Sequence, residues 1–199
     1  MSAHSAPNLK RLFFRPAIMT MQRNIFLVGM PGAGKSTLGK CLAKRLSLAF
    51  VDADHELVAK TGVSIATIFE FEGEAGFRGR EAQMLGELVT RQGIVLATGG
   101  GVILSAANRE ALRSHGVVIY LRASLNDLRL RTMRDNKRPL LQAGDPEQVL
   151  QDLLNTREPL YNEVAHLIID TGRQSATRLA EVILESLTDR GLWMTPPGS

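Results

Sequence analysis

A glycine-rich loop is the first stretch of the sequence whose residue types and spacing suggest chemistry. Residues 29–37 read GMPGAGKST, which fits the pattern G-x-x-x-x-G-K-[ST] and stands between an apolar segment and a helical one. The glycines let backbone N–H groups turn towards phosphate oxygens, and the following helix adds the positive end of its dipole. Lys35 would meet the β- and γ-phosphates, and the Ser36 hydroxyl would bind Mg²⁺. The loop therefore predicts a nucleoside triphosphate site.

Two aspartates follow the next apolar run, which ends in VDAD at residues 51–54. If the chain is extended there, Asp52 and Asp54 share a face at the strand end where parallel sheets bind ligands. One carboxylate can then hold Mg²⁺ through water while the other accepts a proton from an attacking hydroxyl. The alternative is an aspartate that only caps the following helix.

An arginine and a glutamate stand one helical turn apart in EAGFRGRE, residues 74–81. Arg78 and Glu81 can pair on one helix face, and the neighbouring Phe77 favours a partly buried setting. A guanidinium held in this way keeps donors for a carboxylate ligand in bidentate geometry. The alternative is an exposed ion pair, which contributes only about 0.3–0.5 kcal/mol to stability.

Three consecutive glycines end another apolar run, VLATGGG at residues 95–101. Glycine loses more conformational freedom on folding than any other residue, so the run needs either a loose turn or a close neighbour to explain it. This strand end carries no carboxylate, whereas helicases and transport ATPases use an acid at a strand end to help hold magnesium. Because those classes are also usually longer, a small-molecule kinase is favoured.

The elements that must position these residues can be predicted from alternating apolar and helical segments. Strands are predicted at residues 24–29, 48–54, 94–98, 117–121 and 166–170. Helices are predicted at about 36–46, 55–92 (broken near 61–62 and 73–76), 106–114, 124–133, 147–162 and 175–187. This alternation predicts an α/β fold, with a five-stranded parallel sheet and helices on both faces.

Composition indicates one globular domain. The chain has 199 residues, 44% of them hydrophobic, and no apolar run near the ~20 residues that span a bilayer. The one cysteine, Cys41, excludes an internal disulfide and fits a reducing compartment. Residues 1–24 carry four basic side chains and no acid, so the remaining 20 basic and 20 acidic residues balance. The net charge of +4 therefore belongs to this leader and argues only weakly for a nucleic-acid partner.

Three segments are expected along the chain. A flexible basic leader occupies residues 1–23, a single domain residues 24–190, and a frayed tail residues 191–199. Residues 134–146 are polar and interrupted by proline and glycine, and residues 122–138 hold six basic side chains against two acidic ones. Because such a cluster repels itself until phosphates bind, a mobile lid is expected at about 131–146. A merely solvated helix face is the alternative.

Six motifs occur in the order and with the spacings of the shikimate kinase family. They are GMPGAGKST, DAD, FRGRE, GGG, KRPLL (137–141) and TREPLYNEVA (156–165). From about residue 24 to 187 the chain therefore resembles shikimate kinases, P-loop enzymes similar to nucleoside monophosphate (NMP) kinases. These enzymes transfer the γ-phosphate of ATP to the 3-hydroxyl of shikimate. Gluconate-type kinases share the loop but lack the FRxxE, GGG and RxPLY set.

The resemblance implies a role for each matching residue. The ATP phosphates would be bound by Gly32, Ala33, Gly34, Lys35, Ser36 and Thr37, with Arg138 closing over them from the lid. Lys35, Asp54 and Arg138 would be catalytic, with Asp54 as the base. Shikimate would be held by Asp54, Arg78, Gly100 and Arg157, with Glu81 orienting Arg78. Mg²⁺ would be bound by Ser36 and, through water, by Asp52.

The resemblance also implies how the substrates approach. Gln174, in the segment DTGRQSA (170–176), would contact adenine, and Arg131 would either stack on the adenine or lie on a solvated lid helix. Gly99, Gly100 and Gly101 would form a wall that lets the shikimate ring approach the main chain. A monomer in the cytoplasm is implied, without a nucleic-acid or membrane partner. Phosphorylation of another polyol acid such as gluconate, an ATPase stimulated by nucleic acid, and a relative that binds without turnover remain as alternatives.

Overall fold

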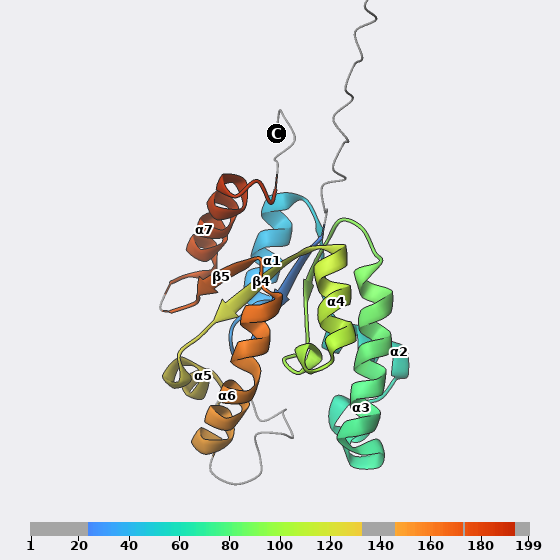
Figure 1. Cartoon of the computed structure of the whole chain (residues 1–199). Helices are drawn as coiled ribbons and strands as arrows, with labels where there is room; N and C mark the ends of the chain where they lie inside the picture. Colours follow the sequence, from blue (N-terminus) through green and yellow to red (C-terminus); the bar gives the residue numbers. More distant parts are fainter. Residues whose placement is uncertain (1–23, 133–145, 173, 194–199) are drawn as a thin grey trace, which may run out of the picture.

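The computed structural model describes residues 24–132, 146–172 and 174–193, drawn in colour in Figure 1. The predicted leader at 1–23, most of the predicted lid including Arg138, and residues 194–199 lie outside the described residues. The loops and helices that carry the other predicted site residues are all within them.

One parallel sheet forms the centre of the protein, with strand order β2-β3-β1-β4-β5. The strands are β1 (Ile25–Val28), β2 (Ala49–Asp52), β3 (Ile94–Ala97), β4 (Val117–Arg122) and β5 (Leu167–Asp170). The central strands β1 and β3 are buried throughout and β4 almost throughout, whereas the edge strand β5 alternates between buried and exposed residues. The predicted five-stranded parallel sheet is confirmed, and continuous apolar runs mark its central strands.

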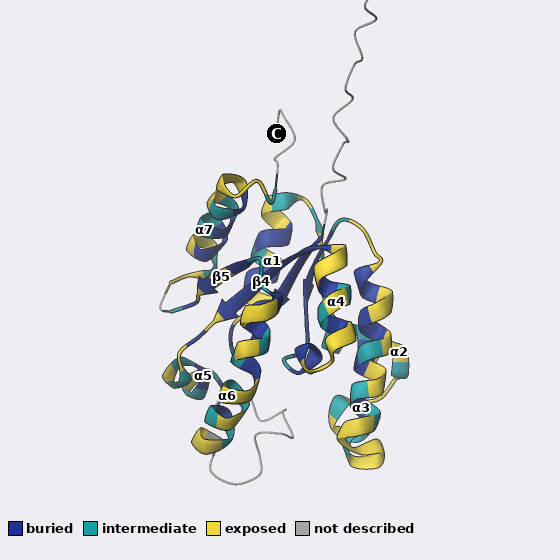
Figure 2. Cartoon of the chain, in the orientation of Figure 1, coloured by how far each residue is buried: buried dark blue, intermediate teal, exposed yellow. Residues whose placement is uncertain are grey.

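Helices cover both faces of the sheet, as predicted. They are α1 (Lys35–Leu46), α2 (Ala53–Thr61), α3 (Ile65–Val89), the 3₁₀ turn η1 (Val102–Leu104), α4 (Ala106–His115), α5 (Leu125–Thr132), α6 (Pro146–Val164) and α7 (Ala176–Asp189). Helices α1 and α7 pack together on one face, while α3, α4 and α6 lie on the other (Figure 1). Figure 2 shows the sheet in the buried colour and the helices buried on their inner sides and exposed on their outer sides.

Two breaks divide the long helical block at the predicted places. Helix α2 ends at Gly62, whose φ of 73° is in the left-handed region that favours glycine. Within α3, Gly73 has φ 67° and ψ −174°, which kinks the helix between its first two turns and the segment that carries Arg78. In the described part of the chain, none of the helices combines the length and the apolar character that a bilayer crossing requires.

Candidate active site

The loop between β1 and α1 curls as the glycine pattern predicts. Gly29, Gly32 and Gly34 have φ values of 145°, 83° and 92°, which side chains rarely tolerate. Lys35 is buried, and its Nζ donates hydrogen bonds to the carbonyl oxygens of Gly29 (2.8 Å) and Met30 (3.0 Å). The ammonium is therefore held against the loop, as a phosphate-binding lysine must be.

Ser36 and Asp52 come together at the carboxyl edge of the sheet. The Ser36 hydroxyl donates to Oδ2 of Asp52 at 2.6 Å. The other oxygen of Asp52, Oδ1, accepts from the backbone N–H groups of Asp54 (3.1 Å) and His55 (3.4 Å) and so caps α2. The helix cap that the sequence left as an alternative is thus present, and the same carboxylate also contacts the phosphate loop.

This donor set suits Mg²⁺. A hydroxyl and a carboxylate are hard oxygen ligands of the kind that Mg²⁺ prefers, together with water and phosphate oxygens. The described residues hold no cluster of three or more carboxylate, imidazole or thiol groups able to bind a metal. The protein therefore offers a partial coordination sphere, which is the usual arrangement for a cation that arrives with a nucleotide.

Asp54 lies on a helix, and the prediction of an extended chain at this point is wrong. Strand β2 ends at Asp52, and α2 begins at Ala53, because the Asp52 side chain satisfies the first free N–H groups of the helix. The Asp54 side chain still lies beside the glycine strand end, because its Oδ1 is 3.3 Å from the position that a Cβ on Gly99 would occupy.

Arg78 and Glu81 on α3 form the predicted pair, and it is not an exposed one. Arg78 NH1 donates to Oε2 of Glu81 at 2.7 Å, and Glu81 is only 7% exposed. Arg78 also bonds Glu74 through Nε (3.2 Å) and NH2 (3.0 Å). Burial raises the pKa of Glu81, and Arg78 partly offsets that rise. Burial alone would lower the pKa of Arg78. The attraction of Glu81 and Glu74 outweighs the effect of burial, so the pKa of Arg78 is raised.

Arg157 on α6 supplies a second buried guanidinium. It is 4% exposed, and burial lowers its pKa, as does the nearby charge of Arg78. Within residues 24–132, 146–172 and 174–193, Arg157 makes no ion pair, and the nearby Tyr161 hydroxyl and Glu81 carboxylate only partly offset the lowering of its pKa. A guanidinium stays charged even under these conditions, and Glu81 is already paired with Arg78, so part of this buried positive charge is left for another anion to match.

The three glycines at the end of β3 make room for neighbouring side chains. A Cβ on Gly99 would collide with Oε1 of Glu81, and one on Gly101 would collide with the guanidinium of Arg78. A Cβ on Gly100 would come within 2.9 Å of Pro31 in the phosphate loop. The glycines thus bring the acidic and basic side chains of α3 and the phosphate loop against one strand end. Contact between Gly100 and a substrate ring stays a prediction.

On the opposite side of the phosphate loop, Arg131 joins two segments. Its NH2 donates to the Gly172 carbonyl at 2.8 Å, and its NH1 lies 3.4 Å from the Gly32 carbonyl and 3.3 Å from Thr171 Oγ1. The alternative of a solvated side chain is therefore wrong. Gln174 is exposed in the adjoining segment, and its contact with adenine stays a prediction.

Tyr161 is the residue that sequence reasoning missed. Its hydroxyl donates to the Gly100 carbonyl at 2.5 Å, and its ring stacks on Tyr120 with centroids 4.9 Å apart. The spacing held a usable signal: Arg157 and Tyr161 are four residues apart, which places both on one face of α6.

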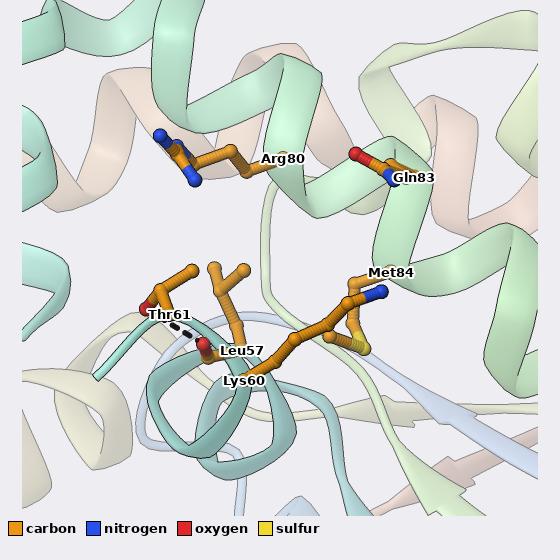
Figure 3. Close-up of a pocket in the computed structure, with 6 residues that line it drawn as sticks. All are labelled: Leu57, Lys60, Thr61, Arg80, Gln83 and Met84. Atoms are coloured by element: carbon orange, nitrogen blue, oxygen red, sulfur yellow. Dashed lines mark hydrogen bonds between the residues drawn. The ribbon is translucent and has the colours of Figure 1, made fainter. Parts of the chain in front are cut away.

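A separate pocket lies between α2 and α3, away from these residues. It has a volume of about 190 Å³ and is lined by Leu57, Lys60, Thr61, Arg80, Gln83 and Met84 (Figure 3). Lys60 is paired with Glu87 and Arg80 with Glu72, so both cations of this pocket are already matched. The pocket is therefore not a second candidate for anion binding.

The sheet order, the glycine loop before α1 and the basic cluster at the carboxyl edge define a P-loop kinase with an NMP-kinase-like fold. The chain belongs to the shikimate kinase family, whose sequence profile matches residues 31–188. It is 52% identical to a shikimate kinase of Burkholderia pseudomallei over 173 residues, which cover 87% of this chain and 94% of the relative.

Solved structures agree with this assignment. A shikimate kinase from Acinetobacter baumannii, in complex with shikimate, superposes with a TM-score of 0.83 at 51% identity and covers 85% of this chain and 95% of its own. A gluconokinase from Sinorhizobium meliloti, at 20% identity and a TM-score of 0.56 over 85% of this chain and 95% of its own, shares the fold alone.

Proposed function

We propose that the protein transfers the γ-phosphate of ATP to the 3-hydroxyl of shikimate, giving shikimate 3-phosphate and ADP. The observation that carries this proposal is Arg157, a buried guanidinium without an ion pair in the described residues, beside the Arg78–Glu81 pair. Family membership supports the same acceptor. A carboxylate-bearing acceptor would match this charge and accept donors from both arginines.

The nucleotide half of the site is the phosphate loop with Lys35. The loop residues Gly32, Ala33 and Gly34, the start of α1, and the side chains of Lys35, Ser36 and Thr37 would hold the phosphates of ATP. Mg²⁺, held by Ser36 and through water by Asp52, would supply neutralisation of the charge on the transferred group. Asp52 orients the Ser36 hydroxyl by accepting a hydrogen bond from it at 2.6 Å.

The acceptor half is built from α2, α3, α6 and the glycine strand end. Arg78 and Arg157 would grip the carboxylate of shikimate while Glu81 orients Arg78. Asp54, on the first turn of α2 beside Gly99, would accept the proton of the attacking hydroxyl, and Gly100 would donate its N–H to the ring. Most of the rate enhancement would come from holding the two substrates in line, since phosphoryl transfer needs little covalent help from a protein.

The remaining assignments are part of the same proposal. Arg138 would close over the phosphates from a lid at about 131–146, and Gln174 would contact the adenine. Residues 24–190 would act as one kinase domain, a monomer in the cytoplasm, with residues 1–23 and 191–199 outside the catalytic unit. No nucleic-acid or membrane partner is proposed.

Release of ADP, measured with and without shikimate, tests the proposal. We expect rapid release only when ATP, Mg²⁺ and shikimate are all present. Three compounds serve as controls in place of shikimate. Shikimate methyl ester lacks the negative charge that Arg78 and Arg157 would bind. Gluconate and single-stranded DNA test the alternative functions of a gluconate-type kinase and an ATPase stimulated by nucleic acid. Turnover with gluconate or with DNA alone, or equal turnover with the ester, would overturn the proposed acceptor.

A further inference from the structure

Tyr161 links the two parts of the acceptor site that come from different regions of the chain. It is fully buried on α6, donates to the Gly100 carbonyl at the end of β3, and lies one helical turn along α6 from Arg157, whose nearby charge acts on the Tyr161 hydroxyl. We propose that Tyr161 is a positioning residue that fixes Arg157 and the Gly100–Gly101 peptide relative to each other, so that both meet the carboxylate-bearing acceptor. This inference rests on the proposed function.

Hydrogen bonding of the glycine backbone supports the first part of the proposed role, which is to fix the Gly100–Gly101 peptide. The carbonyls of Gly99 and Gly101 accept from the backbone N–H groups of Val102 (3.4 Å) and Leu104 (3.0 Å), while the Gly100 carbonyl accepts from Tyr161. Among the bonds between described residues, the N–H groups of the three glycines donate none. Because a peptide unit is planar and trans, holding a carbonyl fixes the direction of the next N–H. Tyr161 therefore sets the Gly101 N–H, which would meet the acceptor in addition to the Gly100 N–H of the proposed function.

That Tyr161 carries no charge supports the second part of the proposed role, which concerns Arg157. Glu81 holds Arg78 by an ion pair, whereas Arg157 has the neutral Tyr161 hydroxyl near it and no ion pair of its own among the described residues. A buried cation that has no ion pair of its own is left to attract the carboxylate of a substrate. Burial raises the pKa of Tyr161, so the hydroxyl remains protonated and remains a donor to Gly100.

The neighbouring Tyr120 offers a matched control. It is stacked on Tyr161, is equally buried and carries the same hydroxyl, but its oxygen has no hydrogen-bond partner among the described residues. Replacing either tyrosine by phenylalanine removes one buried oxygen and keeps the stacked rings. Only the change at Tyr161 removes a link to Gly100 and Arg157.

The test compares Tyr161→Phe with Tyr120→Phe in the full chain. Calorimetric titration gives the Kd of shikimate and, separately, that of Mg-ATP, and steady-state kinetics give KM and kcat. We expect Tyr161→Phe to raise the Kd of shikimate about tenfold or more, as for a lost bond next to a charged group. Its Kd for Mg-ATP should be unchanged, and Tyr120→Phe should change neither value.

Each other outcome contradicts the positioning role. The positioning role is overturned if Tyr161→Phe binds shikimate as tightly as the wild type does. It is also overturned if the variant binds Mg-ATP and shikimate equally weakly, as a general loss of structure would cause. If this variant does not fold, 3-fluorotyrosine at position 161 keeps the hydroxyl, and its ¹⁹F resonance should shift with shikimate more than with Mg-ATP. A resonance that ignores shikimate would equally overturn the role. Failure of the proposed function is distinguishable, because then the wild type itself would not bind shikimate.

Discussion

At the scale of single residues, each charged group of the candidate site has a partner that suits one task. Lys35 is held by two backbone carbonyls and Arg78 by two glutamates, whereas Arg157 lies near the neutral Tyr161 hydroxyl. Carbonyls and hydroxyls orient a cation without cancelling it, whereas a carboxylate does both. In our proposal these two arginines form a clamp for the acceptor carboxylate, in which Glu74 and Glu81 hold Arg78 while Arg157 offers most of the charge.

Replacing Arg157 tests this division. Arg157→Ala should weaken shikimate binding by about 2–4 kcal/mol, because it removes a charged partner from a desolvated carboxylate. ATP binding should change little, because the phosphate loop is built from β1 and α1 and not from α6. Calorimetric titration with each substrate separately measures both effects. Equal losses for ATP and shikimate would show that Arg157 does not belong to the acceptor side.

A glycine substitution tests the clamp without touching a charged residue. In Gly101→Ala the new methyl group would displace the guanidinium of Arg78, which is the far end of a flexible side chain. The fold should therefore tolerate the change, while shikimate binding weakens about tenfold or more as Arg78 loses its position.

Gly79→Ala is the matched control, because Gly79 is exposed on α3 with open space where its Cβ would lie. This variant should keep wild-type kinetics and gain roughly 0.5–1 kcal/mol of stability from better helix propensity. Denaturant unfolding and shikimate titration of both variants give the comparison. Gly101→Ala with normal shikimate affinity would contradict the packing of Arg78 against Gly101.

At the scale of elements, the carboxyl edge of the sheet decides where the chemistry can take place. Strands β1, β2 and β3 end side by side, so the phosphate loop, Asp52 and the three glycines meet although they are far apart in the sequence. The sequence predicts this meeting, because apolar runs mark the strands and parallel strands share their carboxyl edge. The strands and the breaks at Gly62 and Gly73 could be predicted because each has a local signal.

Other features depend on contacts that a local pattern does not contain. The end of β2 was misplaced because the VDAD run suits a strand, while the cap formed by Asp52 starts the helix one residue later. The contact between Tyr161 and Gly100 joins residues 61 positions apart, and η1 depends on the glycine turn before it. The types of residue in the site were therefore predictable, but the packing that orients them was not.

The cap of α2 gives an element-scale prediction. In Asp52→Asn the side-chain oxygen can still cap the helix, so the free energy of unfolding should change by less than about 1 kcal/mol. The variant loses the charge that holds Ser36 and, in our proposal, supports Mg²⁺, so kcat should fall about 10–100-fold.

Two further measurements separate the cap from the charge. Asp52→Ala should lose the same activity and, in addition, about 0.5–2 kcal/mol of stability with the cap. Raising the Mg²⁺ concentration should partly restore the kcat of Asp52→Asn. An Asp52→Asn enzyme with wild-type kcat at low Mg²⁺ would show that Asp52 acts only as a cap.

At the scale of the whole molecule, the described residues form one layered α/β unit, and the predicted lid follows α5 in the sequence. Helix α5 lies next to the phosphate loop, because Arg131 donates hydrogen bonds to the carbonyls of both Gly32 and Gly172. In the sequence, the run of basic residues at 122–138 extends beyond α5 to Arg138. In our proposal the lid at about 131–146 closes over ATP and the acceptor and excludes the water that could otherwise hydrolyse ATP.

Arg138 is the residue of that segment on which we expect catalysis to depend. It lies outside the described residues, so the expectation rests on the sequence motif KRPLL and on the charge that develops as the γ-phosphate transfers. Arg138→Ala should lower kcat by about two orders of magnitude or more, a loss of about 3 kcal/mol of transition-state stabilisation. Shikimate binding should survive, because the proposed clamp comes from α3 and α6.

Arg122→Ala is the matched control: this exposed arginine precedes α5 and is paired with Asp170, so its loss should leave kcat unchanged. Steady-state kinetics of both variants, beside a direct shikimate titration, measure the difference. A near-normal kcat for Arg138→Ala would mean that phosphoryl transfer proceeds without this charge.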